Sequence, residues 1–299
     1  MAQICCRCIL SSEMSNVQIG EDGLCNFCRN SKPDSTPRMA IEILRQEILS
    51  HVRDEGADYD AVVALSGGKD SSVTLYIARE QLKLKPLAVT VDNGFLSQGA
   101  LDNCRKVTDF LSVDWILVRN NVKEYKQIFR QSYIERESPC PTCSLLNMRT
   151  VCKIADEKGL GLVLTGHETL STYNSNDDSF TGGITYPAAQ AYFDGGTLRN
   201  NISVVRVLAL FSIGEKQLME ILRILPWQPP DTIGGVSCEI LGLSMAKAFE
   251  RLNFHPYSFE FAEAVRTGKL TREEGLELIK KPMIPSDIET RLLERLNLT

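Results

Sequence analysis

The feature that most constrains the fold is the stretch from Tyr59 to Leu82, where an apolar run leads through a glycine turn into a helical pattern. Residues 60–65 read DAVVAL, a continuous apolar run of the kind found in strands buried on both faces. The turn Ser-Gly-Gly-Lys-Asp-Ser-Ser follows at 66–72, and the residues after it have the spacing of an amphipathic helix. A buried strand that leads directly into a helix is typical of a parallel sheet with helices packed on its faces.

The same alternation of strand and helix continues to about residue 170. Further apolar runs predict buried strands at 86–92, 113–118 and 161–167, and amphipathic stretches lie between them. We therefore expect an α/β fold, a doubly wound parallel sheet, as the main domain of the chain.

Different sequence patterns flank this region. The first 34 residues are rich in cysteine and end in a polar, proline-containing linker. Residues 170–201 are rich in Gly, Asn, Asp and Ser, which is typical of a lid or binding segment. The remainder predicts helices, and Thr271 and Glu274 form a capping box at the start of one of them. The expected division is 1–34, 35–235 and 236–299.

The composition indicates an ordinary globular protein, with 43% hydrophobic and 24% charged residues. No apolar run approaches the roughly 18 residues of a membrane helix, and the beginning MAQICCRC does not resemble a signal peptide. We therefore expect a cytoplasmic protein, whose ten cysteines are metal ligands or reactive thiols rather than disulfides. The net charge of −5 argues against a broad electropositive nucleic-acid surface but leaves room for a local basic face.

The glycine turn has the chemistry of an anion site at the carboxyl edge of the sheet, where open α/β sheets bind ligands. Gly67 and Gly68 allow close backbone approach, and the amides at a helix start favour an anion. Lys69 supplies a positive charge, and Asp70 is a candidate ligand for Mg²⁺ between phosphates. The hydroxyl groups come from Ser66, Ser71 and Ser72.

This turn resembles the pyrophosphatase loop of the PP-loop ATPases, the adenine nucleotide alpha hydrolases. TVDNG at Thr90–Gly94 and LTGHE at Leu164–Glu168 resemble later motifs of that family, in the same order, so the resemblance covers roughly residues 55–225. It implies that ATP is split to AMP and pyrophosphate, that an oxygen is activated as an adenylate, and that a nitrogen or sulfur nucleophile then displaces AMP. Many relatives continue Gly-His with Asn and an Asp-Asp pair, whereas this chain reads GHETLSTYNSNDD. The implied nucleotide residues are Ser66, Gly67, Gly68, Lys69, Asp70, Ser71, Ser72, Asp92, Gly166 and His167.

Four cysteines near the beginning of the chain predict a zinc ribbon. Cys5 and Cys8 form one CxxC pair and Cys25 and Cys28 a second, with the separation of a zinc ribbon between the pairs. Four thiolates suit a structural, tetrahedral zinc ion with no open position. The alternative is a set of free cysteines on an unstructured tail, and Cys6 has no assigned role.

A second group of cysteines lies far along the chain. Cys140 and Cys143 form a CxxC just before a predicted helix, and Cys238 precedes another helix. Such a set can hold three irons of a [4Fe-4S] cluster and leave the fourth iron open. Alternatives are a persulfide on Cys140 or Cys143, a second zinc site, or simple burial of Cys238. We expect Cys104 and Cys152 to pack in the core.

Two enzyme families within the PP-loop group resemble this chain. The three distant cysteines resemble those of the iron–sulfur tRNA thiolases of the 2-thiocytidine and 2-thiouridine type. The N-terminal ribbon, the glycine turn and the stretch AVRTGKLTREEGLELIKK resemble the N-acetyl sugar amidotransferases, which use ammonia from a partner glutaminase. A third reading is a zinc-ribbon adaptor that binds nucleotide without turnover, but Lys69 and Asp70 are both present, which argues against it.

We favour ATP-dependent sulfur transfer over amidation, because the amidotransferases do not need the three-cysteine site. The predicted catalytic residues are Lys69, Asp70, Cys140 and Cys143, and the predicted cofactors are ATP, Mg²⁺, Zn²⁺ and a [4Fe-4S] cluster. The expected partners are a tRNA or small-molecule acceptor and a sulfur donor, with no membrane. A homodimer is an open alternative to a monomer.

Overall fold

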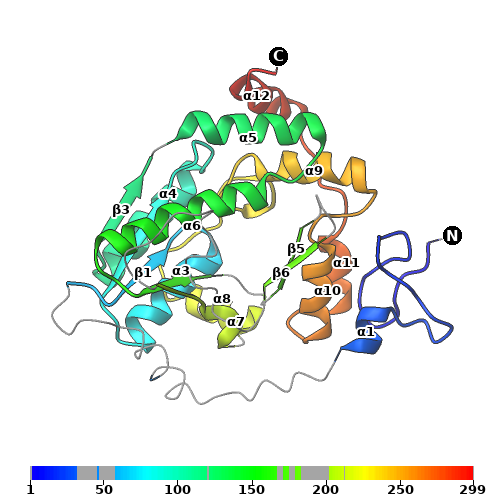
Figure 1. The fold of residues 1–299 in the computed structure, drawn as a ribbon, viewed down its shortest axis with the longest axis horizontal. Coiled ribbons are helices and arrows are strands. Elements are labelled where there is room, and N and C mark those ends of the chain that lie inside the picture. Colours follow the sequence, from blue (N-terminus) through cyan, green and yellow to red (C-terminus); the bar gives the residue numbers. More distant parts are fainter. Residues whose placement is uncertain are drawn as a thin grey trace.

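The centre of the molecule is a five-stranded parallel sheet with the strand order β3-β2-β1-β4-β7 (Figure 1). The computed structural model describes residues 2–31, 46, 58–119, 121–166, 171–174, 179–182, 202–211 and 213–298. The strands are β1 (Ala61–Ala64), β2 (Pro86–Val91), β3 (Trp115–Val118), β4 (Leu162–Thr165) and β7 (Ser203–Arg206). The predicted parallel α/β sheet is confirmed.

Successive strand residues face two different hydrophobic cores, because the side chains of a strand alternate between its faces. In β1, Ala61 and Val63 contribute to one core and Val62 contributes to the other. β4 repeats this alternation. Burial on both faces explains why the strands read as continuous apolar runs in the sequence.

Helices cover both faces of the sheet. The first core contains side chains from α3 (Lys69–Tyr76), its π-helical continuation η1 (Ile77–Gln81), α4 (Gln98–Leu111), α7 (Val207–Leu210) and α8 (Glu215–Leu222). The second core contains side chains from α5 (Val122–Glu135), α6 (Cys140–Glu157), α9 (Leu241–Leu252) and α12 (Ser286–Leu296). A short 3₁₀ turn, η3 (Ile233–Gly235), precedes α9.

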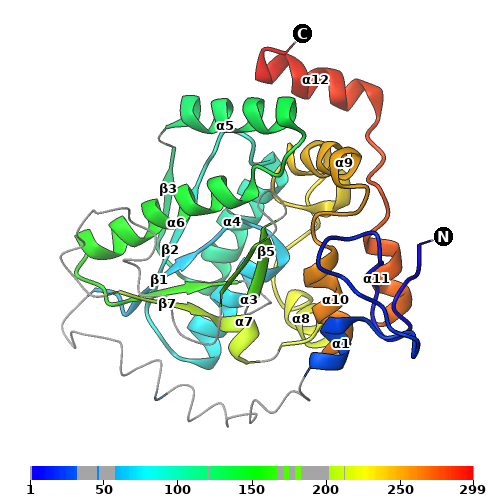
Figure 2. The same ribbon diagram turned by 45° about the vertical axis from the view of Figure 1, so that its right-hand side comes forward.

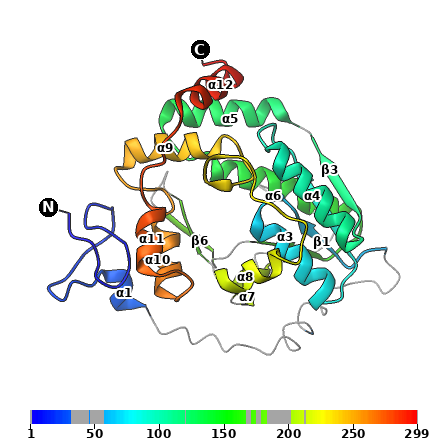
Figure 3. The ribbon, with the colours of Figure 1, turned by 180° about the vertical axis from the view of Figure 1, so that it is seen from behind.

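The N-terminal segment packs against helices from the other end of the chain. Figures 1, 2 and 3 all show α1 (Asn26–Asn30) beside α10 (Ser258–Arg266) and α11 (Arg272–Leu278). A third hydrophobic core joins the two regions, with Phe254 and Phe259 among the N-terminal cysteines. The helical C-terminal region is as predicted, and the capping box forms because Thr271 N–H donates to Glu274 Oε2 at 2.8 Å.

The segment that we expect to act as a lid contains a two-stranded antiparallel sheet. Its strands are β5 (Ser171–Asn174) and β6 (Ser179–Gly182), and the rest of 170–201 lies outside the described residues. The role of this segment as a lid stays a prediction. Among the described residues, no helix is both long and apolar enough to cross a membrane.

Candidate active site: a glycine loop and three cysteines on one cavity

The glycine loop forms where β1 ends and α3 begins, at the carboxyl edge of the sheet. Gly67 has φ +74°, a left-handed conformation that strains any residue with a side chain. A Cβ atom on Gly67 would lie 2.0 Å from the carbonyl oxygen of Ala100, so α4 approaches the loop as closely as glycine allows. On the other side, a Cβ on Gly166 would lie 2.8 Å from the carbonyl carbon of Asp70. The backbone just after β4 therefore lies in close contact with the first turn of α3.

Hydroxyl groups hold the loop in shape from within. The Ser66 N–H donates to Ser71 Oγ at 3.1 Å, and the Ser72 hydroxyl donates to Gly68 O at 2.9 Å. Ser72 is fully buried, so in this structure its side chain supports the turn, whereas Ser66 and Ser71 line the adjacent cavity. The carbonyl oxygen of Gly67 accepts from the side chains of Asn103 and Trp227 at 3.1 and 3.0 Å.

Two charged residues that sequence reasoning did not single out pair with predicted site residues. Lys69 Nζ lies 2.7 Å from Oε2 of Glu215, the first residue of α8. Arg119, just after β3, lies 3.3 Å from the carboxylate of Asp92. The only local signal for Glu215 was its place at the start of a predicted amphipathic helix, and no local pattern indicates Arg119. The predicted residue His167 lies outside the described residues.

A cavity of about 370 Å³ joins the glycine loop to the distant cysteines. The loop side is lined by Ser66, Asp70, Ser71 and Gly166. The same cavity is also lined by Cys140 and Cys143 and by the distant Cys238. Apolar residues, including Val89, Val91, Phe129, Met148 and Val151, also line this cavity.

Two different elements place these three cysteines. Cys140 and Cys143 lie within the first turn of α6 rather than before it, and their spacing of three puts them on one helix face. The segment of Cys238 lies against the loop after β2, because Ser97 N–H donates to Ser237 O at 2.9 Å and Glu239 N–H donates to Phe95 O at 2.8 Å. The structure thus brings the predicted set together.

Burial keeps these thiols neutral in the metal-free protein at neutral pH. It raises the pKa of Cys143 to about 11 and that of Cys238 to about 12. Burial also raises the pKa of Cys140, although a hydrogen bond with the hydroxyl of Tyr257, next to α10, opposes it. A metal that binds here must therefore displace protons from buried sulfurs.

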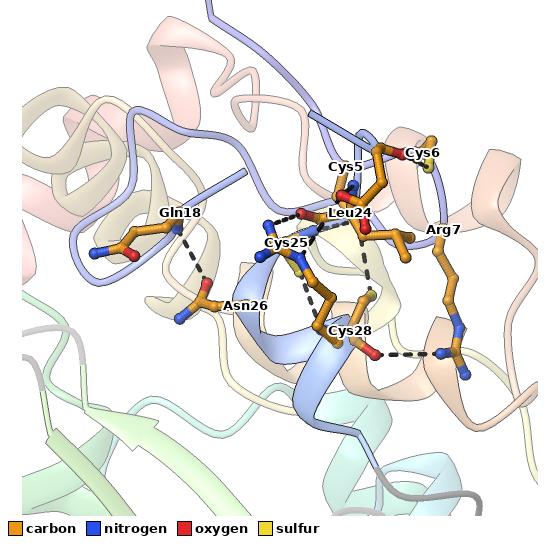
Figure 4. Close-up of polar contacts among 10 residues, drawn as sticks. Cys5, Cys6, Arg7, Gln18, Leu24, Cys25, Asn26 and Cys28 are labelled. Atoms are coloured by element: carbon orange, nitrogen blue, oxygen red, sulfur yellow. Dashed lines mark hydrogen bonds and ion pairs between the residues drawn. The ribbon is translucent and has the colours of Figure 1, made fainter. Parts of the chain in front are cut away.

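The N-terminal cysteines Cys5, Cys8, Cys25 and Cys28 have the geometry of a single-ion site. Figure 4 labels three of them, Cys5, Cys25 and Cys28. Their four sulfurs lie within 4.8 Å of one another, and all four residues are buried. The Sγ–Sγ distances are 3.7 Å for Cys5 and Cys28 and 3.6 Å for Cys8 and Cys25. Sulfurs at ~2.3 Å from a tetrahedral zinc ion lie about 3.8 Å apart, so the donor set fits zinc closely.

The remaining cysteines have simpler surroundings. Cys104 and Cys152 are fully buried within hydrophobic cores, as predicted. Cys6 is exposed, and its sulfur lies 3.8 Å from the carbonyl oxygen of Asp22. Cys6 does not belong to the group of four sulfurs that suits a metal.

A parallel α/β sheet whose first strand turns through Ser-Gly-Gly-Lys-Asp into a helix defines an ATP-pyrophosphatase type of nucleotide domain. Residues 40–169 match the family model for NAD synthase. Together with the loop sequence, this match supports the predicted resemblance of that part of the chain to the PP-loop ATPases. This supports the prediction of a PP-loop ATP pyrophosphatase at the level of the superfamily, and it applies equally to a thiolase and to an amidotransferase.

Individual relatives and structures are similar to this chain to different extents. An uncharacterized protein of Methanocaldococcus jannaschii is 29% identical over 97% of this chain and 98% of its own length. The tRNA-specific 2-thiouridylase MnmA of Chlamydia felis is 26% identical over 54% of this chain and 48% of its own length. The U34-tRNA thiolase NcsA from Methanococcus maripaludis, solved with its [4Fe-4S] cluster, aligns with a TM-score of 0.40 and 16% identity, covering 83% of this chain and 86% of that one.

Proposed function

We propose that this protein is an ATP-dependent sulfurtransferase that forms AMP and pyrophosphate, with a tRNA base as the acceptor of sulfur. The observation that carries the proposal is the shared cavity, which is lined both by residues of the glycine loop and by Cys140, Cys143 and Cys238. An acceptor that is adenylated at the loop is therefore already in the cavity that contains the cysteine sulfurs. The matching 2-thiouridylase of Chlamydia felis, whose name specifies tRNA, supports the same acceptor class.

The loop binds the phosphates of ATP in this proposal. The backbone N–H groups in the first turn of α3, which begins at Lys69, would face the phosphates at the edge of the sheet. Lys69 contacts the phosphates and stabilises the charge that develops as the adenylate forms, and Glu215 holds the lysine at the loop. Asp70, whose side chain lines the cavity, binds the Mg²⁺ ion that accompanies ATP.

The three cavity cysteines would hold a [4Fe-4S] cluster through three of its irons. Among the described residues, only the N-terminal cysteines bring three or more sulfurs within 4.8 Å of one another, which favours a multi-iron cluster over a second zinc site at the cavity cysteines. Thiolates on different irons lie farther apart than ligands of one ion, so the wider spacing suits the cluster. When bound, the cluster would supply an open iron that can carry sulfide. Cys140, Cys143 and Cys238 then fix its position facing the nucleotide loop.

The N-terminal cysteines would bind a structural zinc ion, because four protein thiolates leave no open position. Arg272 Nε donates to the carbonyl oxygens of Cys5 and Cys8 at 3.3 and 3.0 Å, which fastens the ribbon to α11. We propose the division 1–34 for the ribbon, 35–235 for the ATP pyrophosphatase domain and 236–299 for the helical region.

The second candidate is an N-acetyl sugar amidotransferase that takes ammonia from a partner glutaminase. Its support is the match of residues 40–169 to the NAD synthase model, together with the resemblance of the ribbon and of the α10–α11 region. The nucleotide chemistry is shared by the two candidates. They differ in the nucleophile, and hence in whether the three cavity cysteines are needed.

A sulfur-transfer assay separates the two candidates. Protein purified without oxygen is incubated with ATP, Mg²⁺, sulfide and unmodified tRNA, and the digested nucleosides are measured by mass spectrometry. The proposal predicts a thiolated nucleoside that requires ATP and is absent with Cys140→Ser. AMP formation that requires ammonium and an N-acetyl sugar, with no thiolated nucleoside, would support the amidotransferase instead.

A further inference from the structure

Asn93 is a buried polar residue that the nucleotide chemistry does not use. It follows β2 in the turn Asp-Asn-Gly and is 3% exposed. Its Oδ1 accepts the backbone N–H of Phe95 at 2.8 Å. Because a backbone N–H can only donate, this bond fixes which end of the amide is the oxygen, and the NH₂ group must point the other way.

The NH₂ group of Asn93 points at two of the cavity cysteines. Its Nδ2 lies 3.6 Å from Sγ of Cys143 and 4.0 Å from Sγ of Cys238. One side chain thus reaches a sulfur on α6 and a sulfur on the segment before α9, although these cysteines are far apart in the sequence. Asn93 is therefore positioned to fix the two sulfurs relative to each other.

A second amide approaches Cys143 from within α6. Asn147 Nδ2 lies 3.8 Å from Cys143 Sγ, and Asn147 Oδ1 accepts the hydroxyl of the buried Tyr125 at 2.7 Å. Cys143 thus receives amide N–H groups from two different elements. Both amides line the cavity beside apolar side chains, and a hydrogen bond is stronger in such surroundings than in water.

Amide donors of this kind favour electron-rich sulfur. A neutral thiol is a weak acceptor, whereas a thiolate, free or bound to iron, accepts N–H groups strongly. Hydrogen bonds to the sulfurs are one of the factors that set the reduction potential of an iron–sulfur cluster, because they stabilise the more negative, reduced state. Two donors at Cys143 and one at Cys238 therefore have a measurable electronic consequence.

We propose that Asn93, assisted by Asn147, is a positioning residue for the sulfur site, which holds the sulfurs of Cys143 and Cys238 together and raises the reduction potential of the cluster they bind. The inference rests on the proposed function, since it assumes that the three cysteines hold iron. It also links the sulfur site to the nucleotide site, because Asn93 belongs to the turn that carries Asp92.

The test is a redox titration of the protein purified with its cluster, in which the visible spectrum is followed against applied potential. Asn93→Leu removes the donor at similar size, and Asn93→Asp replaces it with a carboxylate of the same shape. We expect the midpoint potential to fall in the order wild type, Asn93→Leu, Asn93→Asp, since a carboxylate repels the electron added to the cluster. Asn147→Leu, which loses one donor at Cys143 alone, lies between wild type and Asn93→Leu.

Ser144→Ala is the matched control, because Ser144 lines the same cavity and no described hydrogen bond joins it to a sulfur. Its potential stays at the wild-type value, and all variants are compared at equal iron content. Unchanged potentials in the Asn93 and Asn147 variants of an iron-bearing protein would overturn this inference alone. A wild-type protein without iron would overturn the proposed function and the inference together.

Discussion

Asp70 and Cys140 line the same cavity, yet we propose different roles for them, Mg²⁺ binding for Asp70 and cluster binding for Cys140. Asp70→Asn keeps the size of the side chain but removes the negative charge that we propose binds Mg²⁺. We predict that pyrophosphate release falls by about 10²-fold or more while the iron content stays at the wild-type level. Pyrophosphate release by an enzymatic phosphate assay and iron by colorimetry, on the same preparation, check the prediction.

The matched control is Asp109→Asn, an exposed position on α4 away from the loop, which should leave both quantities unchanged. Loss of iron together with pyrophosphate release in Asp70→Asn would contradict the separation of roles. A variant that releases pyrophosphate normally would remove Asp70 from the nucleotide site.

Single site residues could be predicted from the sequence where they belong to a contiguous motif. Gly67 and Asp70 belong to one contiguous turn, so a strand followed by a helix was enough to place them. Glu215 and Asn93 were missed for a physical reason. Their contacts with Lys69 and Cys238 join residues 146 and 145 positions apart, and no local pattern encodes such pairs.

The C-terminal helix α12 holds two parts of the site together. Arg295 Nη2 donates to Gly94 O at 2.7 Å, and its guanidinium lies 4.4 Å from the ring centroid of Phe95 and pairs with Glu239. These contacts tie the turn of Asn93 to the segment of Cys238. We predict that Arg295→Ala destabilises the fold by about 1–2 kcal/mol and lowers iron occupancy, with zinc unchanged.

Urea unfolding and metal analysis of the same samples measure these effects. Arg291→Ala, an exposed change on the same helix, serves as the control and should behave as wild type. Full iron occupancy in Arg295→Ala would show that α12 does not position the cysteine segment.

The positions of helices and strands were easier to predict from the sequence than the packing of one element against another. The buried strands could be recognised in the sequence as apolar runs, because helices cover both faces of the sheet. The start of α6 was expected after Cys143 but lies at Cys140, since Pro141 is tolerated in the first turn of a helix. The meeting of the N-terminal segment with α10 and α11 could not be predicted, because it depends on packing between the two ends of the chain.

At the scale of the whole molecule, the N-terminal ribbon and the C-terminal helices form one hydrophobic unit. Cys25→Ser removes one of four thiolates and leaves the others unable to hold zinc tightly. We predict loss of zinc, a lower melting temperature and faster proteolysis of residues 2–31, while ATP still binds. Metal analysis, calorimetry and equilibrium ATP binding check the three parts.

Cys6→Ser is the control for that change, because Cys6 is exposed and outside the four-sulfur group. Zinc content and melting temperature should stay at wild-type values in this variant. Full zinc content in Cys25→Ser would contradict the assignment of the ribbon as the zinc site.

The central claim is that Cys140, Cys143 and Cys238 hold an iron–sulfur cluster beside the nucleotide loop. It is tested most directly by iron and acid-labile sulfide content, with a visible spectrum, in protein purified without oxygen. We predict about four irons and about four sulfides per chain, together with a broad visible absorbance. Both Cys140→Ser and Cys238→Ser should lack this absorbance. A colourless protein that contains zinc alone would contradict it and favour the amidotransferase.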